Sequence, residues 1–142
     1  MADERTYTDR TLIDVVERGF EGWNQRDLEM IGRQVGDDFV LESDALPHPV
    51  RGRAALLEFA RSYLSAFPDL EFTIDDVFAS ADRVVASWEA TGTHQGTLNG
   101  VPPTGRHVRV RGCTISHFRG GRIVRQQAFW DMATLMRQIR GA

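Results

Sequence analysis

The chain has 142 residues, of which 42% are hydrophobic and 26% charged, with a formal net charge of -3. This length suits a single domain, residues 1–142, with a real core and room for a ligand cavity. The negative net charge and scattered arginines argue against a nucleic-acid-binding protein, and there is no apolar run near the roughly 20 residues of a membrane span. The N-terminus lacks the basic and apolar regions of a signal peptide. We therefore expect a soluble, cytoplasmic protein whose residues 1–7 are flexible.

Two helices and a strand are predicted in the first third of the chain. Apolar residues recur at i, i+3, i+4 and i+7 over residues 8–25, behind a start signal at Thr8-Asp9. Asp27 is placed to cap a shorter second helix that ends near Gly36. A strand is expected at about 38–44.

The rest of the chain predicts one more helix and then mostly strands. The helix lies between Gly52 and Pro68, since proline cannot donate the helical amide hydrogen bond. The alternating segments lie at about 70–79, 83–94, 106–119 and 122–131. Ala81-Asp82 and Gly120-Gly121 supply tight turns, and the glycine pair suits the positive φ angles of a type I′ hairpin.

Helices followed by a long meander of strands define an α+β fold. We expect a cone-shaped, curved sheet, antiparallel or mixed, that wraps around the N-terminal helices, with an internal pocket and a short C-terminal helix. The loop 95–105 is too rich in glycine and proline to pair as a strand. It is expected to border the mouth of the cone.

Asp131 is the best candidate for chemistry, because it ends an otherwise apolar strand. Alternation places Gln127 and Phe129 on the same face as Asp131, where desolvation would raise the carboxyl pKa toward the range useful for proton transfer. The alternative is that Asp131 caps the helix that begins at Met132, since aspartate accepts hydrogen bonds from first-turn amides. The sequence leaves both interpretations open.

Other reactive side chains give weaker signals. His94 lies on the apolar face of its strand, where a histidine is either a hydrogen-bonded structural residue or a functional one. The single cysteine, Cys113, is interpreted as a small packed residue in a strand. The four histidines, His48, His94, His107 and His117, lack the spacing of a metal site, and no glycine-rich phosphate loop is present. We therefore expect no metal and no cofactor.

Five short motifs, taken together and in this order, resemble one family. They are Phe20-x-x-Trp23-Asn24-x-x-Asp27, Ala66-Phe67-Pro68-Asp69-Leu70, Gly92-Thr93-His94-x-Gly96, Pro103-Thr104-Gly105, and Gly121-Arg122-Ile123-Val124 through Asp131. The chain is similar over nearly its whole length to the SnoaL-like polyketide cyclases, or ester cyclases, of the nuclear-transport-factor-type α+β cone superfamily. The resemblance implies a cone with a deep pocket, no cofactor, and a homodimer built sheet to sheet. The arginine-rich outer face of the sheet fits either a solvated surface or a polar interface.

The resemblance also implies an activity and a set of site residues. Cyclases of this family close a ring in a polyketide ester by intramolecular aldol condensation, and Asp131 stands where the family places its acid/base carboxylate. His94 matches a family pocket position, and we expect His94 and Gln127 to hydrogen-bond the developing enolate or the attacked carbonyl. The expected aromatic walls for a small hydrophobic or aromatic substrate are Trp88, Trp130, Phe129 and Trp23. Lesser pocket candidates are Asp44, His48 and Tyr63.

Two departures from the family pattern leave the substrate open. Gln127 stands where many relatives carry tryptophan, and Arg125-Gln126 stands where an acid and a histidine are frequent. Because one fold supports many activities, a binding domain without turnover, in which Asp131 only caps a helix, is the main alternative. A cofactorless hydroxylase or isomerase of the same fold is the second.

Overall fold

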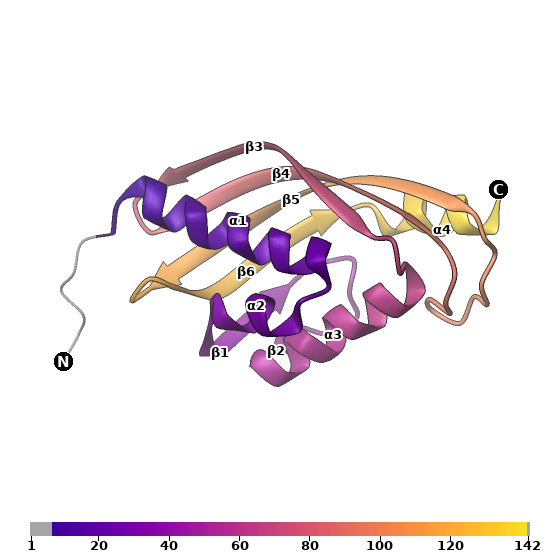
Figure 1. The fold of residues 1–142 in the computed structure, drawn as a ribbon, viewed down its shortest axis with the longest axis horizontal. Helices are drawn as coiled ribbons and strands as arrows, with labels where there is room; N and C mark the ends of the chain where they lie inside the picture. Colours follow the sequence, from indigo (N-terminus) through magenta and orange to yellow (C-terminus); the bar gives the residue numbers. More distant parts are fainter. Residues whose placement is uncertain (1–6, 142) are drawn as a thin grey trace.

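A computed structural model describes residues 7–141, which form four helices and six strands in the α+β arrangement expected (Figure 1). The elements are α1 (Asp9–Gln25), α2 (Leu28–Arg33), β1 (Val35–Glu42), β2 (Val50–Arg51), α3 (Arg53–Ala66), β3 (Glu71–Ser80), β4 (Arg83–Thr93), β5 (His107–Arg119), β6 (Arg122–Trp130) and α4 (Met132–Arg140). Of the N-terminal segment predicted to be flexible, residues 1–6 lie outside the described residues. Tyr7 is half-buried, against Gly121.

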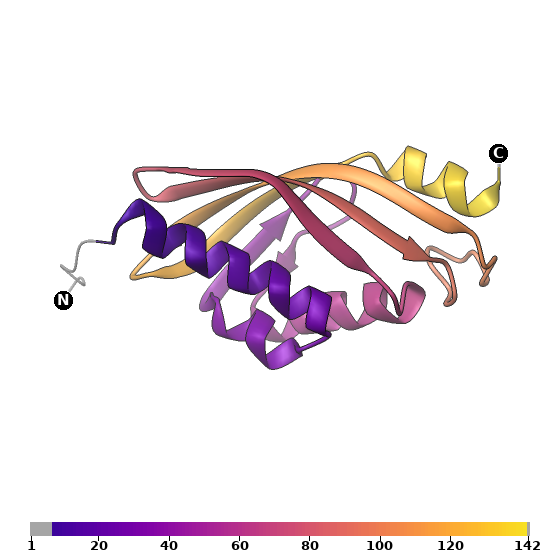
Figure 2. The same cartoon turned by 45° about the horizontal axis from the view of Figure 1, so that its top comes forward.

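The strands form one curved, unclosed sheet in the order β2-β1-β6-β5-β4-β3. The meander from β3 to β6 is antiparallel, as predicted, while β1 runs parallel to β6 and makes the sheet mixed. The two-residue strand β2, which pairs with β1, was not predicted. Figures 1 and 2 show α1, α2 and α3 on one side of the sheet, with α4 beyond its far end.

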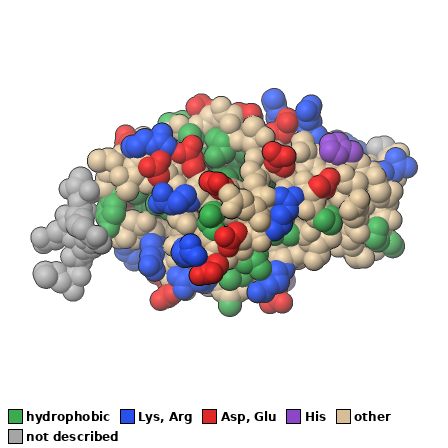
Figure 3. All heavy atoms as spheres, viewed as in Figure 1, with side chains coloured by type: hydrophobic (Ala, Val, Ile, Leu, Met, Phe, Trp, Pro, Cys, Tyr) green, Lys and Arg blue, Asp and Glu red, His purple; other side chains and the backbone are tan. Residues whose placement is uncertain are grey.

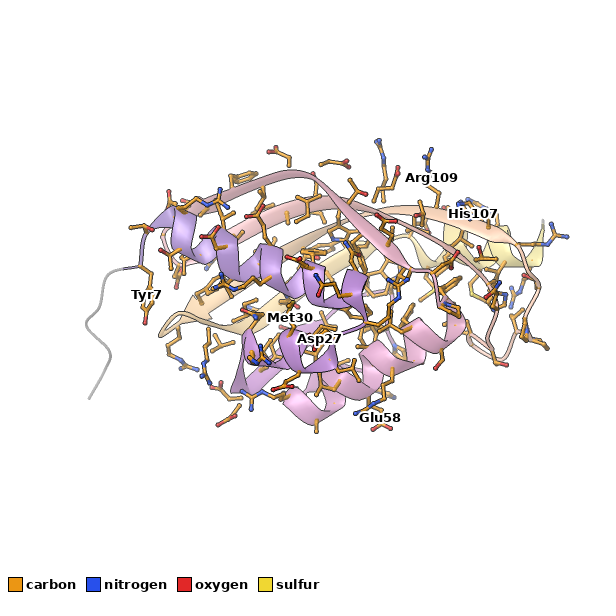
Figure 4. All side chains as sticks on the ribbon, viewed as in Figure 1. Tyr7, Asp27, Met30, Glu58, His107 and Arg109 are labelled. Carbon is orange, nitrogen blue, oxygen red and sulfur yellow. The ribbon has the colours of Figure 1, made fainter. Side chains whose placement is uncertain are left out.

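The first two helices begin at the predicted caps. The Thr8 hydroxyl accepts the Thr11 amide at 3.1 Å, and Asp27 accepts the Met30 amide at 3.0 Å. Figure 4 shows Asp27 at the junction of α1 and α2. The second helix ends at Arg33, not near Gly36, because Val35 already pairs with Ile123 of β6. The strand predicted at 38–44 therefore begins earlier.

The predicted turn at Gly120-Gly121 is confirmed, with φ angles of 60° and 75°. These left-handed values are costly for residues with a Cβ atom, which explains the glycine pair. The hairpin that they form joins β5 to β6 and fixes how the two strands pair.

A bulge in β6 reverses the faces that were predicted for the end of this strand. His117 pairs with Arg125 and Phe118 with Ile123, so Val124 has no partner in the β5 ladder. An extra residue moves every later side chain to the opposite face. Gln126, Ala128 and Trp130 therefore face the helices, and the prediction that Gln127 and Phe129 point inward is wrong.

Two amide side chains each form a pair of hydrogen bonds, here called a clamp, with the backbone of a strand residue that lacks a neighbouring strand on one side. The Asn24 amide donates to the Phe72 carbonyl at 2.9 Å and accepts from the Phe72 amide at 2.7 Å, which ties α1 to the edge strand β3. Gln138 of α4 makes the same pair of bonds with Arg109 of β5, at 2.9 and 2.8 Å. Each clamp satisfies a donor and an acceptor that the ladder leaves open.

The loop 95–105 packs against the domain. Leu98 is buried and bridges to Val101, and both residues belong to an apolar cluster with α4. The amides of Gln95 and Gly96 donate to the Ala66 carbonyl, at 2.9 and 3.1 Å. The loop thus joins the end of α3 to the C-terminal helix.

The Asn24 clamp gives a first prediction. Asn24→Leu removes two partly buried hydrogen bonds and leaves the Phe72 backbone groups unpaired, so it should lower the free energy of unfolding by about 2 kcal/mol. Urea denaturation measures this change. The matched control is Gln25→Leu, whose exposed amide bonds only Glu21 of its own helix. Equal, small losses in the two variants would contradict the clamp.

Candidate functional site

A cavity lies between the helices and the concave face of the sheet. It measures about 150 Å³, and about 1020 Å³ when the space open to solvent is included. Helices α1 and α3 contribute one wall, and the inward residues of β3, β4, β5 and β6 contribute the other.

Aromatic rings form a large part of the wall of the cavity. All three tryptophans of the chain, Trp23, Trp88 and Trp130, line it, together with Phe20, Phe59, Phe67 and Phe72. Phe72 is central to this group, since its ring makes edge contacts with Phe20, Trp23 and Trp88 at centroid distances of 5.4, 5.6 and 5.2 Å. The predictions that Trp23, Trp88 and Trp130 are wall residues are consistent with this placement.

The indole ring of Trp88 lies across the neighbouring strand β5. The part of the cavity wall around this ring is called the floor of the cavity below. A Cβ atom at Gly112 would stand 2.2 Å from the indole ring, so only glycine leaves room for it. The indole N–H donates to the Thr114 hydroxyl at 2.9 Å. Gly112 and Thr114 thus fix both the position and the rotation of the ring.

Polar groups are few in this wall. Tyr63, a pocket candidate from the sequence, reaches it from α3, and Thr114 and Gln126 reach it from β5 and β6. Burial raises the pKa of the Tyr63 hydroxyl to about 12. Tyr63 is therefore neutral at physiological pH. Among the described residues, no carboxylate and no imidazole lines the cavity.

Asp131 is exposed and caps α4. Its carboxylate accepts the Thr134 hydroxyl at 2.8 Å and the amides of Ala133 and Thr134 at 3.0 and 3.2 Å. These bonds, led by the one from the Thr134 hydroxyl, lower the pKa of Asp131. The expectation that desolvation raises this pKa is wrong, because the group is exposed and hydrogen-bonded. The capping interpretation is confirmed, and the catalytic one stays a prediction.

His94 is fully buried beside the cavity wall, not in it. Its ring lies 5.6 Å from that of Phe67, which does line the cavity. Nδ1 accepts the Thr104 amide at 3.3 Å and lies 3.0 Å from the Thr104 hydroxyl, which assigns the ring proton to Nε2. Nε2 has no hydrogen-bond partner among the described residues. His94 therefore anchors the loop that Thr104 belongs to.

The remaining sequence candidates lie away from the cavity. Gln127 and Phe129 are on the outer face, where Gln127 accepts a hydrogen bond from His117 Nε2 at 2.9 Å. Asp44 and His48 are both exposed on the segment after β1. None of these four residues lines the cavity.

Two polar residues of the cavity wall, Thr114 and Gln126, were not identified from the sequence. Thr114 shares the alternation of the buried residues Val108 and Val110, so its inward position was readable. Gln126 was hidden by the bulge at Val124, which shifts the alternation only after the two strands have paired.

The described residues hold no cluster of metal-binding side chains. None of their helices has the length and apolar character needed to cross a bilayer.

Comparison with models of protein families shows which family the chain belongs to. The family model for SnoaL-like polyketide cyclases matches residues 13–139. The chain belongs to this family. Its motifs now have structural reasons: Asn24 clamps β3, Asp69 binds Thr93, and Gly92 and Gly96 allow close contact with the end of α3. A comparison with curated proteins gives no match.

Solved structures with the same fold come from several bacteria. The putative hydroxylase AclR from Streptomyces galilaeus is 27% identical, with a TM-score of 0.84 over 95% of this chain and 84% of AclR. IdmH, a putative polyketide cyclase from Streptomyces antibioticus, is 29% identical, with a TM-score of 0.78 over 91% and 98%. A putative SnoaL-like cyclase from Jannaschia, at 24% identity and a TM-score of 0.88 over 99% of both chains, supports the fold alone.

The raised pKa of Tyr63 predicts a loss of stability at high pH. Tyrosine ionises near pH 10 in the unfolded chain but near 12 in the folded one, so the folded state loses relative stability as pH rises from 10 to 12. The loss should reach about 2 kcal/mol at pH 12. Urea denaturation between pH 9 and 12 should show it in wild type and in Tyr7→Phe, but not in Tyr63→Phe. The chain has no lysine that would titrate in this range.

Proposed function

We propose that the protein is a cofactor-free cyclase that closes a ring in a polyketide ester held in the aromatic cavity. The observation that carries the proposal is the cavity itself, which has aromatic walls and a neutral surface in a chain that belongs to the SnoaL-like family. Flat rings such as Trp88 and Phe72 suit an aromatic or extended unsaturated chain. Holding such a chain in a folded pose brings the two reacting carbons together.

The proposed reaction is an intramolecular aldol closure. A base removes a proton from a carbon next to a carbonyl, and the resulting enolate carbon attacks a second carbonyl to form the C–C bond. The alkoxide so formed takes up the proton. No oxidant, reductant or cofactor is consumed. Hydrogen-bond donors in an apolar cavity can stabilise the enolate and the alkoxide.

Asp131 is the proposed base. It directly follows the cavity residue Trp130 and precedes the cavity residue Leu135, so it is close in sequence to two parts of the wall. A lowered pKa makes a carboxylate a weak base in the free protein. We infer that a substrate extending past Trp130 covers Asp131, and that the desolvation raises its pKa. His94 is proposed to act indirectly, by fixing the loop 95–105.

A binding domain without turnover is the second candidate. Two observations favour it: the described cavity wall has no carboxylate or imidazole, and Asp131 already serves as a helix cap. A cofactorless hydroxylase is a further alternative, supported by the likeness to AclR. Only the hydroxylase would consume oxygen, so product formation under nitrogen separates it from a cyclase.

Asp131→Asn tests the proposed base. Asparagine caps helices about as well as aspartate, so the melting temperature should change by no more than about 2 °C. Turnover should fall by about 100-fold or more, because the amide cannot accept the proton. Aromatic polyketide β-keto esters serve as substrates, with ring closure followed by absorbance and mass.

The control is Asp27→Asn, the same change at the cap of α2, which should keep wild-type turnover. Full activity of Asp131→Asn would remove Asp131 from the mechanism. Binding of the esters to wild type without any product would support the binding domain instead.

We also propose that two copies pair through the outer face of the sheet. Phe78 and Phe129 are 53% and 48% exposed there. Val85, Cys113 and Ile115 lie between them in the strand registers. Exposed aromatic side chains grouped on one face favour an interface over solvent. Charged side chains of both signs are interspersed over the view in Figure 3.

Phe129→Arg should therefore convert a dimer into a monomer, because it places a charge in an apolar interface. Light scattering after size exclusion gives the mass. The control is His107→Arg, at an exposed position of β5 whose side chain points away from the domain in Figure 4. A monomeric wild type, or a dimeric Phe129→Arg variant, would contradict this interface.

A further inference from the structure

The floor of the cavity contains a hydroxyl proton that no described residue accepts. Thr114 Oγ1 accepts the Trp88 indole N–H at 2.9 Å. A threonine hydroxyl has one proton to donate and two lone pairs, so this bond leaves its proton free. Thr114 lines the cavity and is 7% exposed. Its proton is therefore available to a ligand in the cavity.

Gln126 offers a second unused group on the same floor. Its Nε2 lies 3.1 Å from Ser116 Oγ, and its amide oxygen has no partner among the described residues. The serine hydroxyl can donate or accept, so either orientation of the amide satisfies this contact. In both orientations at least one amide N–H and one lone pair remain unused, and Gln126 lines the cavity.

Strand pairing brings the two side chains together. Thr114 pairs with Ala128, and Ser116 pairs with Gln126, so Thr114 and Gln126 are diagonal neighbours on the inner face of β5 and β6. Diagonal neighbours come within reach when one side chain is long. The residue beside Thr114 in β6 is the small Ala128, which leaves space above the pair.

The surroundings decide which ligand group fits there. The neighbouring wall is formed by Trp88, Ala128, Trp130 and other apolar residues. An ionised group placed at this floor would lose its hydration without gaining an opposite charge, which is strongly unfavourable. A neutral carbonyl oxygen needs only a donor, and both Thr114 and Gln126 can supply one.

We propose that Thr114 and Gln126 form a specificity subsite that binds an uncharged carbonyl group of the ligand and excludes carboxylates. The inference rests on the proposed function in one respect only, since it takes the same cavity as the substrate site. It assigns the substrate a ketone or ester carbonyl at the cavity floor.

Three probes of equal ring size test the subsite by binding alone. They are 2-acetylnaphthalene, which has a neutral carbonyl, 2-ethylnaphthalene, which has none, and 2-naphthoate, which is charged at pH 8. Isothermal titration calorimetry gives the dissociation constants, and the fluorescence of the three cavity tryptophans confirms the location. Wild type should bind the ketone about tenfold more tightly than the hydrocarbon, and the carboxylate at least about 100-fold more weakly than the ketone.

Variants then assign the effect to the two residues. Thr114→Val and Gln126→Met should each weaken ketone binding about tenfold and leave hydrocarbon binding within about threefold. Thr114→Ser keeps the hydroxyl and should retain ketone binding. The matched controls are Thr91→Val and Gln127→Met, whose side chains lie on the outer face; both should bind as wild type does.

Other results would overturn the subsite. The subsite is wrong if wild type does not prefer the ketone, which includes a wild type that binds no probe. It is also wrong if the two variants lose as much affinity for the hydrocarbon as for the ketone. Binding of the carboxylate as tight as that of the ketone would exclude it too. The outcome is independent of turnover. A protein with this selectivity and no cyclase activity would refute the proposed function and keep the subsite, whereas an active cyclase without the selectivity would do the reverse.

Discussion

The bidentate bond between Asn24 and the Phe72 backbone is the contact on which the rest of the site depends. Its two hydrogen bonds, of 2.9 and 2.7 Å, fix α1 to the edge strand β3. They do not require side chains to fill the space between the helix and the sheet. Phe72 then places its ring among Phe20, Trp23 and Trp88. A directional polar contact at the edge thus holds the helix at a distance from the curved sheet, and the cavity is the space that remains.

Local patterns predicted most of the fold, because each depends on neighbouring residues. The cap at Asp27, the helix that ends before Pro68 and the hairpin at Gly120-Gly121 all follow from short-range chemistry. The short strand β2 and the early start of β1 could not be predicted in this way. The early start of β1 depends on pairing with a segment distant in the chain, Val35 with Ile123, and β2 has only two residues, too few to show an alternation.

The candidate site was predicted less completely, and for one reason. A single unpaired residue, Val124, exchanged the faces of β6, so that Gln127 and Phe129 were expected inside where Gln126 and Trp130 lie. Trp23 in α1 and Trp88 in β4 line the cavity, and their inward positions follow from local periodicity that does not depend on the register of β6. Asp131 presented the opposite problem, because one residue type serves both as a cap and as a base, and only the Thr134 contacts reveal the cap.

The clamp between Gln138 and Arg109 has a consequence for how the chain avoids edge-to-edge β-pairing with other chains. Strand β5 continues past β6 from His107 to Arg111, and this stretch has a sheet neighbour on one side only, β4. An uncovered strand edge is a template for another chain. Helix α4 covers it, and Gln138 occupies the donor and acceptor of Arg109. The C-terminal helix thus protects the longest strand from intermolecular β-pairing, in addition to closing one end of the cavity.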